Sequence, residues 1–452
     1  MSRYGNIYLI GIGGIGMSAL ARYYHHAGID VSGYDRTPSA ITDALEREGI
    51  PVHYDSNPSL IPPDPENTLV IYTPAIPQEM EEMEYVRSHG YKIVKRSQAL
   101  GEVTCGKRCL AVSGTHGKTT TSTMLAHILT SSGEGCTAFL GGISKNYGTN
   151  LLLADNDVIV AEADEFDRSF LRLYPEAAVV TSMDADHLDI YSDLEDLRDT
   201  FVQFGMQTSK YLIIRKGLEE RFIKAGVKAT VVTYGEGGDY YASDIVSDGE
   251  GKMYFDLHTP SGVIPKCHAG VPGMVNIGNA TAAAAMALLH GVSPEKVKEA
   301  ISSFKGVARR FDIRLNIPGH LYIDDYAHHP AEIAATIASI RQAYPGRRIL
   351  GIFQPHLYSR TKDFYREFAD SLSRLDEVIL LPVYPAREQP IPGVSSRMIL
   401  DLITTDKKMA LQKEELPDEL ERRDTDIVVT FGAGDIDRLA KPIQDLLERK
   451  YA

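Results

Sequence analysis

The sequence predicts an α/β protein built from parallel sheets, and two patterns along it support this fold class. Short runs rich in Val, Ile and Leu alternate with segments of helical length, which is typical of strands covered by helices on both faces. Polar or glycine-rich residues follow nearly every run, where the carboxyl end of a parallel strand would place a ligand site. Each of the following segments is expected to begin with a strand: 6–13, 69–76, 108–117, 157–165, 177–187, 211–217, 320–329, 348–356, 377–386 and 426–435.

The chain of 452 residues is too long for one ordinary domain, and its length predicts roughly three domains. A boundary is expected near Gly106, before a second strand–loop–helix unit, and another near Arg314. The predicted domains are a Rossmann-like domain over residues 1–106, a P-loop ATPase domain over 107–313 and a Rossmann-like domain over 314–452. The central domain is expected to carry added antiparallel strands within residues 240–272, where β-prone pieces alternate with Gly and Pro turns.

Composition excludes several classes of protein. A hydrophobic content of 43% with 24% charged residues is typical of a globular protein, and no apolar run approaches the roughly 20 residues of a membrane span. We expect a cytoplasmic location, because the N-terminal segment has no signal-peptide pattern. The net charge of −14 argues against a nucleic-acid partner. The sequence leaves the oligomeric state open.

The first glycine loop, in "YLIGIGGIGMSALA", has the pattern G-x-G-x-x-G after an apolar run. Its glycines are Gly11, Gly13, Gly14 and Gly16, and Asp35 ends the next apolar stretch. This layout is that of a dinucleotide-binding fingerprint and raises the hypothesis of an NAD-dependent oxidoreductase. An ordinary strand–turn–helix connection would give the same pattern.

A second glycine loop, in "LAVSGTHGKTTTSTML", indicates a nucleoside triphosphate instead. Val112 stands where a strict P-loop pattern has its first glycine, but the physical core of the motif remains. Backbone N–H groups and the start of a helix can hold phosphates, a lysine can reach the terminal phosphate oxygens, and a threonine can bind Mg²⁺. The candidate ATP-binding residues are Gly114, Thr115, Gly117, Lys118, Thr119 and Thr120. The hypothesis of an NAD-dependent oxidoreductase does not explain this second loop.

Acidic residues follow the next two expected strands, as a metal partner for such a loop requires. The first group is Glu162, Asp164 and Glu165, and the second is Asp184, Asp186 and His187. Carboxylate oxygens are preferred ligands of Mg²⁺, so these groups favour a Mg²⁺ site, with His187 as the less expected ligand. Solvated surface carboxylates are the alternative.

Seven segments together resemble the Mur ligases: GTHGKTTT, EADE, DADHLD, NIGNATAA, RRFD, DDYAHHPAEI and QPHLYSRT. The resemblance covers essentially the full chain. It implies three domains that bind a UDP-sugar, ATP and an amino acid. It also implies an ATP-dependent ligase that joins L-alanine to the carboxylate of UDP-N-acetylmuramate through an acyl phosphate, in an early cytoplasmic step of peptidoglycan biosynthesis.

Two alternatives stay open beside this implied activity. A sibling ligase that attaches a preformed L-alanyl-peptide to the same UDP-sugar would share most of these segments. A P-loop nucleotide switch would share the second glycine loop. Activity with L-alanine or with an L-alanyl-peptide distinguishes the two ligases from each other. Phosphate release from ATP without either substrate would indicate the nucleotide switch.

The resemblance implies roles for the residues of the first two domains. The first glycine loop would bind the diphosphate of the UDP-sugar, and Asp35 its uridine. Lys118 would neutralise the transferring phosphoryl group, and Thr119 with Glu162 would hold Mg²⁺. His187 would bind a second Mg²⁺. Lys118 and His187 are therefore the catalytic candidates in this part of the chain.

The third domain supplies the remaining candidates. Tyr326, His328 and His329 follow one expected strand, and His356 and Arg360 follow another. Histidine and arginine at neighbouring strand ends favour binding a carboxylate and handling an amine. The resemblance therefore makes His356 and Arg360 catalytic candidates near the amino acid. Leu357 stands where the family usually has a second arginine.

The remaining nucleotide contacts are also implied by the resemblance. Asn276 and Asn279 are the adenine candidates, Asp324 is the ribose candidate, and Arg309 or Arg310 is the phosphate candidate. Asn276 has a second interpretation as the N-cap of the Ala-rich helix that Gly291 would end. Val275 stands where the family commonly has histidine.

Overall fold

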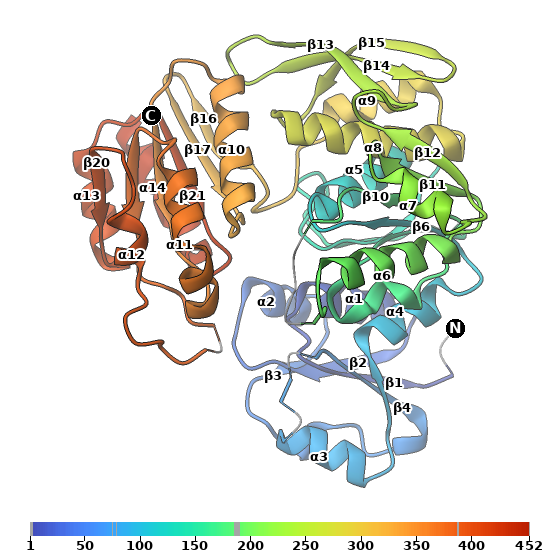
Figure 1. The fold of residues 1–452 in the computed structure, drawn as a ribbon. Coiled ribbons are helices and arrows are strands. Elements are labelled where there is room, and N and C mark those ends of the chain that lie inside the picture. Colours follow the sequence, from blue (N-terminus) through green and yellow to red (C-terminus); the bar gives the residue numbers. More distant parts are fainter. Residues whose placement is uncertain (1–2, 75, 78, 185–189, 387, 452) are drawn as a thin grey trace. The chain divides into compact units, whose positions relative to one another are not determined.

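The computed structural model describes residues 3–74, 76–77, 79–184, 190–386 and 388–451. The chain divides into two compact units (Figure 1). The first unit contains residues 1–243, 256–267 and 278–304, and the second contains residues 244–255, 268–277 and 305–452. The predicted α/β fold class with parallel sheets is confirmed, and we describe each unit by itself.

The N-terminal sheet of the first unit has the strand order β3-β2-β1-β4-β5, with all its neighbours parallel. Its strands are β1 Asn6–Ile10, β2 Asp30–Tyr34, β3 Val52–His53, β4 Thr68–Tyr72 and β5 Lys92–Lys95. Its helices are α1 Ile15–His26, α2 Ala40–Arg47, α3 Glu81–Ser88 and α4 Arg96–Thr104, with 3-10 turns at Pro58–Leu60 and Pro65–Asn67. Side chains alternate across β1, so that both faces of the sheet are buried.

The central sheet of the first unit has the order β12-β11-β10-β6-β9-β7-β8. Its strands are β6 Arg108–Ser113, β7 Thr137–Phe139, β8 Leu151–Leu152, β9 Val158–Glu162, β10 Ala177–Val180, β11 Tyr211–Arg215 and β12 Thr230–Tyr234. The pair β7–β8 is antiparallel and the other pairs are parallel. The helical segments of this region are α5 Lys118–Ser131, η3 Phe166–Arg172, α6 Leu194–Gln207, α7 Glu219–Lys224, α8 Met274–His290 and α9 Pro294–Ser303.

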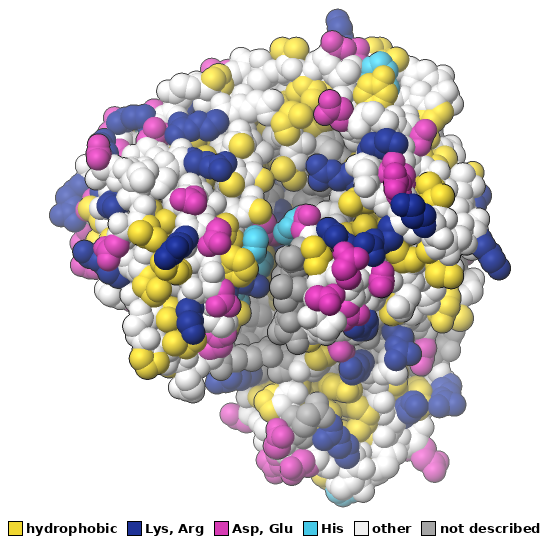
Figure 2. All heavy atoms as spheres, viewed as in Figure 1, with side chains coloured by type: hydrophobic (Ala, Val, Ile, Leu, Met, Phe, Trp, Pro, Cys, Tyr) yellow, Lys and Arg dark blue, Asp and Glu magenta, His cyan; other side chains and the backbone are white. Residues whose placement is uncertain are grey.

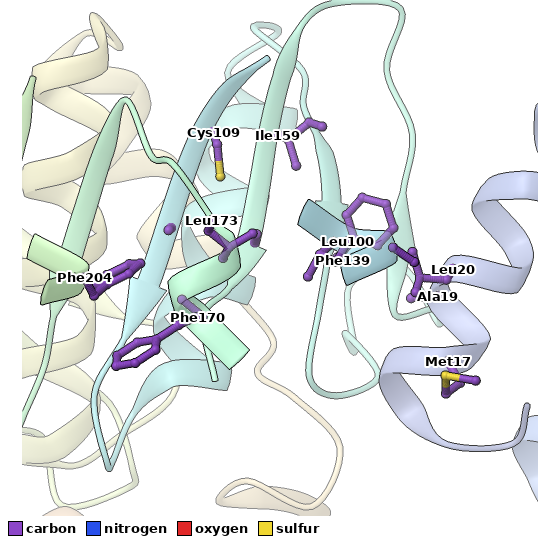
Figure 3. Close-up of a cluster of buried hydrophobic side chains, with 14 of the residues drawn as sticks. Met17, Ala19, Leu20, Leu100, Cys109, Phe139, Ile159, Phe170, Leu173 and Phe204 are labelled. Carbon is purple, nitrogen blue, oxygen red and sulfur yellow. The ribbon is translucent and has the colours of Figure 1, made fainter. Parts of the chain in front are cut away.

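One hydrophobic cluster of the first unit joins elements of both sheets (Figure 3). Met17 and Leu20 of α1 belong to the same buried cluster as Phe139 of β7 and Ile159 of β9. A shared core of this kind fixes α1 against the central sheet, because burial of apolar surface stabilises their contact. The first glycine loop is therefore held close to the strand ends of the central sheet.

The added strands are β13 Tyr241–Ser247, β14 Met253–Thr259 and β15 Gly262–Ala269, in that order in a separate three-stranded sheet. Helix α8, which follows them, begins at Met274 rather than at Asn276. The prediction of Asn276 as N-cap is therefore wrong: its side chain lies inside the first turn, where Nδ2 donates to the Pro272 carbonyl at 2.8 Å. Gly291, with a φ of 112°, follows the end of α8 as predicted.

The sheet of the second unit has the order β16-β17-β21-β18-β19-β20, with β16 and β17 antiparallel. Its strands are β16 Asp312–Ile317, β17 His320–Asp325, β18 Ile349–Phe353, β19 Glu377–Leu380, β20 Lys407–Ala410 and β21 Ile427–Phe431. Its helical segments are α10 Pro330–Ala343, α11 Tyr358–Leu372, α12 Ser396–Leu400, η4 Lys413–Glu415, α13 Leu416–Arg422 and α14 Asp437–Tyr451.

A third glycine loop, between β21 and α14, is filled by protein atoms. A Cβ on Gly432 would lie 2.8 Å from the Gln354 carbonyl oxygen, and a Cβ on Gly434 would lie 2.6 Å from Gln354 Oε1. The fully buried Gln354 side chain accepts a hydrogen bond from the Ile436 N–H and donates to Asp435. The glycines here make room for Gln354.

The molecular surface carries both signs of charge. Lys and Arg side chains alternate with Asp and Glu on the face shown in Figure 2. Across the described residues, no helix combines the length and the apolar character that crossing a membrane requires.

Candidate active site

The second glycine loop connects β6 to α5 in the predicted strand–loop–helix arrangement. Gly114 and Gly117 have φ values of 129° and 81°, which strongly favour glycine. A Cβ on Gly114 would lie 1.9 Å from Thr181 Oγ1, and one on Gly117 would lie 2.6 Å from Asn279 Oδ1. Backbone at this loop therefore approaches its neighbours too closely for any side chain.

Residues at the end of β10 hold this loop in place. The Ser182 hydroxyl bonds the Thr115 hydroxyl at 2.8 Å and accepts the His116 N–H at 2.9 Å. Thr120 and Thr119 are buried in the first turn of α5. The loop is thus ordered by hydrogen bonds within the protein, and Ser182 is a contributor that the sequence analysis did not identify.

Lys118 forms a buried ion pair with Glu165. Its Nζ donates to the two carboxylate oxygens at 2.8 and 2.7 Å, and Glu165 is fully buried. Burial opposes the charge on Lys118, but the carboxylates of Glu165, Asp164 and Glu162 together outweigh burial and raise the pKa of Lys118. The lysine is therefore a fixed cation at the start of α5, as phosphate binding requires.

Glu162 lies at the end of β9, opposite Thr119. The Thr119 hydroxyl donates to Glu162 Oε1 at 3.2 Å. A Cβ on Gly141 would lie 2.3 Å from Glu162 Oε2, so the absence of a side chain at Gly141 makes room for the carboxylate. A carboxylate and a hydroxyl oxygen fit the ligand preference of Mg²⁺.

The other acidic candidates have different partners. Asp164 faces Arg96 with 3.7 Å between the charged groups, and Asp184 faces His116 at 3.8 Å. Within the described ranges, no group of three or more His, Cys, Asp or Glu side chains could hold a metal ion. The predicted ligand His187 and its neighbour Asp186 lie outside the described residues.

The first glycine loop is hydrogen-bonded to Asp35, a contact that the sequence analysis did not predict. The Gly13 N–H donates to Asp35 Oδ2 at 2.8 Å, and a Cβ on Gly13 would lie 2.8 Å from the same oxygen. Gly11 has a φ of 89°, and Gly14 is the N-cap of α1. The Asp35 carboxylate therefore shapes the loop itself.

A pocket of about 310 Å³ extends from this loop to the acidic end of β9. Gly14 and Gly16 line it together with Glu162 and Asp164. Arg96 also lines it, and its guanidinium lies 2.9 Å from where a Cβ on Gly16 would stand. The sequence analysis missed this cation, although its place directly after β5 is a strand end like those of the predicted site residues.

In the second unit, the structure brings His328 and His356 together, with ring centroids 6.2 Å apart. Burial, followed by the charges of His328 and Arg360, lowers the pKa of His356 to about 4. The buried Nδ1 of His356 has no hydrogen-bond partner among the residues that the structure describes. Tyr326 packs edge-on against His328, with 5.2 Å between the ring centroids. Of the five residues predicted in this domain, four therefore gather in one region: Tyr326, His328, His356 and Arg360.

His329 has a structural role at the start of α10. It is the N-cap residue, and the Glu332 carboxylate accepts the backbone N–H groups of both His328 and His329 at 3.0 and 3.2 Å. The His329 ring packs against Phe364 at 5.0 Å. Its ring therefore packs against helix α11.

Helix α11, which carries Arg360, starts from an unusual backbone. Leu357 has a φ of 70°, and its N–H donates to the Tyr384 carbonyl at 2.9 Å. Glu388 Oε2 accepts the Ser359 N–H at 2.9 Å, and its other oxygen accepts the Ser359 hydroxyl. Glu388 thus caps α11 from a distant part of the sequence.

The nucleotide candidates beyond the loops have specific partners. Asn279 Oδ1 accepts the Thr121 hydroxyl at 3.2 Å beside Gly117, within the first unit. In the second unit, Asp324 is buried, accepts the Thr430 hydroxyl at 2.6 Å and faces Arg309 at 3.5 Å. The Arg310 guanidinium stacks on the Tyr326 ring at 4.8 Å.

The two glycine loops and the acidic strand end define a P-loop nucleotide-binding enzyme. Family models match three stretches of the chain: the Mur ligase family catalytic domain over residues 6–108, the Mur ligase middle domain over 112–287 and the Mur ligase glutamate ligase domain over 309–434. The UDP-N-acetylmuramate–L-alanine ligase of Porphyromonas gingivalis is 50% identical over 452 residues, 98% of this chain and 99% of the relative. The chain belongs to the Mur ligase family.

Further relatives agree with this assignment. The UDP-N-acetylmuramate–L-alanine ligase of Phocaeicola vulgatus is 49% identical and covers 98% of both chains. The crystal structure of UDP-N-acetylmuramate-alanine ligase from Thermotoga maritima has a TM-score of 0.83 at 28% identity, covering 98% of each chain. A murein peptide ligase from Psychrobacter arcticus, at 23% identity and a TM-score of 0.71 over 99% of each chain, shares the fold. The three-domain architecture of the family is therefore confirmed for this chain.

Proposed function

We propose that this protein is an ADP-forming ligase that joins the amine of L-alanine to the carboxylate of UDP-N-acetylmuramate at the expense of ATP. The observation that carries this proposal is the 50% identity, over nearly the whole of both chains, to a relative named for that reaction. The pocket between the first glycine loop and Glu162 supports it, because a UDP-sugar must reach from a diphosphate cradle to the ATP site. Since ATP and the UDP-sugar are water-soluble nucleotides, we propose a cytoplasmic location.

The three predicted domains divide the substrates between them in this proposal. Residues 1–106 bind the UDP-sugar, with its diphosphate on the first glycine loop and its uridine near Asp35. Residues 107–313 bind ATP on the second glycine loop, with Asn279 close to it. Residues 314–452 bind L-alanine. The positions of Asn279, beside Gly117, and of Arg96, in the pocket, support the first two assignments.

The phosphate loop prepares the transfer of a phosphoryl group to the sugar carboxylate. In that step a carboxylate oxygen attacks the γ-phosphorus, the bond to the bridging oxygen breaks, and ADP leaves. Lys118 is fixed at the start of α5, so its ammonium group can neutralise charge on the transferring group. Mg²⁺ held by Thr119 and Glu162, and a second Mg²⁺ held by His187, would supply additional charge neutralisation.

The second step needs an amine in its nucleophilic form. The nitrogen of L-alanine attacks the acyl carbon, the bond to phosphate breaks, and the nitrogen passes a proton to the departing phosphate. His356 supports this role, because its lowered pKa of about 4 keeps the imidazole neutral and able to accept a hydrogen bond at pH 7. The Arg360 guanidinium would bind the carboxylate of the amino acid.

The choice of amino donor tests the proposal. Purified protein with ATP, Mg²⁺ and UDP-N-acetylmuramate is given L-alanine or an L-alanyl-peptide, and phosphate release is measured together with the product mass. We expect release with L-alanine and a product heavier by one alanyl residue. Preference for the peptide would instead favour the sibling ligase, and full phosphate release without any donor would favour a nucleotide switch.

A further inference from the structure

The segment from Leu140 to Asn150 joins β7 to β8 and touches both walls of the substrate pocket. At one end, Leu140 and Gly141 line the pocket, and Gly141 leaves the space that the Glu162 carboxylate fills. At the other end, Asn150 is fully buried. The Leu140 N–H donates to the Asn150 carbonyl at 3.0 Å, so the two ends are linked directly.

The Asn150 side chain is bound to helix α1 by hydrogen bonds that fix its orientation. Its Nδ2 donates to the Ile15 carbonyl at 2.5 Å and to Ser18 Oγ at 3.0 Å. Its Oδ1 accepts the Arg22 guanidinium at 2.5 Å. Because a cation lies on the oxygen side and two acceptors lie on the nitrogen side, a single orientation of the amide satisfies all three contacts.

The contact residues are themselves held by other bonds. The Ser18 hydroxyl donates to the Ile15 carbonyl at 3.0 Å, so its lone pairs face Asn150. Arg22 also binds the Glu48 carboxylate through Nε and NH2, at 2.6 and 2.9 Å. Asn150 therefore contacts a preorganised side of α1, whose first turn belongs to the first glycine loop.

We infer that Asn150 is a positioning residue that sets the distance between the first glycine loop and the Glu162 end of the pocket. This inference rests on the proposed function, since it concerns the UDP-sugar and its delivery to the ATP site. Ile15 lies between Gly14 and Gly16, which line the pocket, and Leu140 lies beside Gly141 on the facing wall. One buried amide thus joins the two walls, and a 1 Å error in such an arrangement can cost about a hundredfold in rate.

The same segment offers a matched control at Asn146. Its Nδ2 donates to the Ser303 carbonyl at 2.9 Å, and the neighbouring Tyr147 hydroxyl bonds His127 at 2.9 Å. These bonds attach the middle of the segment to α9 and α5. Asn146→Ala therefore removes one amide from the same segment without touching an Asn150 contact to α1.

The test compares Asn150→Ala with Asn146→Ala by calorimetric binding of UDP-N-acetylmuramate and by steady-state kinetics. Loss of bonds to a buried amide predicts binding about tenfold weaker and a lower kcat for Asn150→Ala. Asn146→Ala should bind as the wild type does. Ser18→Ala, which replaces one acceptor with a good helix former, should weaken binding about threefold and covers the case in which Asn150→Ala does not fold.

Hydrogen exchange of the free protein gives a readout that needs no substrate. The backbone amides of residues 15–20 should exchange about tenfold faster in Asn150→Ala and at the wild-type rate in Asn146→Ala. Equal exchange and equal binding in folded Asn150→Ala and wild type would overturn the inference, as would equal losses in both alanine variants. A wild-type protein that does not bind the UDP-sugar would instead overturn the proposed function, with the exchange difference still deciding the role of Asn150.

Discussion

Gly141→Ala should impair the proposed Mg²⁺ site while leaving the fold almost unchanged. The backbone at Gly141 lies outside the left-handed region, so alanine can adopt its conformation. The added Cβ would lie 2.3 Å from Glu162 Oε2 and 2.5 Å from Oε1 and Cδ. These atoms are the far end of a flexible side chain, and the carboxylate can rotate away without moving the strand.

The displacement follows from these distances. To reach 3.0 Å, the shortest separation that real Cβ atoms show, the oxygen that starts at 2.3 Å must move by about 0.7 Å, and about 1.1 Å restores an ordinary contact at 3.4 Å. We expect a stability change below about 1 kcal/mol, because the end of a flexible side chain can move into the adjacent pocket. A shift of this size at a metal ligand should lower kcat by about a hundredfold.

The assay measures kcat at increasing Mg²⁺ concentration and, separately, the thermal unfolding midpoint. Gly278→Ala is the control, since a Cβ at Gly278 of α8 meets no atom within 4 Å and alanine favours helix. We expect Gly141→Ala to need more Mg²⁺ at an almost unchanged midpoint. A variant with wild-type kcat and Mg²⁺ dependence would refute the placement of Glu162 as a metal ligand.

Three further outcomes follow from the structure. Lys118→Ala should lower turnover at least about a hundredfold and stability by about 3–5 kcal/mol, because it leaves Glu165 buried without its cation. The double variant Lys118→Ala with Glu165→Gln should recover the stability measured by urea unfolding but not the activity. Burial raises the pKa of Asp325 to about 6, so the stabilising contribution of its protonated carboxyl group is fully present below pH 4 and is lost as pH rises through 6. Asp325→Asn should therefore raise the thermal unfolding midpoint more at pH 7.5 than at pH 4, and equal shifts at the two pH values would contradict this. Glu388→Ala should cost about 1 kcal/mol and raise KM for L-alanine by uncapping α11, whereas unchanged KM would exclude a role in placing Arg360.

Local patterns were sufficient to predict the fold class and the strand–loop–helix arrangement of the two glycine loops. Strand and helix periods are set by neighbouring residues, and glycines with positive φ mark where a backbone must turn sharply. The proximity of Gly13 to Asp35 follows from the strand order, since β1 and β2 are adjacent and parallel. These features need no knowledge of distant packing.

Contacts between distant segments were not predictable in the same way. Lys118 and Glu165 were both identified, but Glu165 was grouped with the metal ligands and lies instead against the lysine, 47 residues away. No sequence motif surrounds Arg96. Its place in the pocket wall depends on how α4, which begins at Arg96, packs in the folded chain. The start of α8 was misplaced because Gly273, with a φ of 108°, allows the turn before Met274 that the N-cap prediction assigned to Asn276.

The filled third glycine loop bears on the design of inhibitors against this enzyme class. A phosphate mimic aimed at Gly432 and Gly434 would have to expel the amide of Gln354 and break its bonds to Ile436 and Asp435. Each broken bond to a buried group costs about 1–3 kcal/mol, which the mimic would have to offset before it gained affinity. Compounds that imitate a nucleotide should therefore be selected for occupancy of the other two loops, and their resistance mutations are expected there.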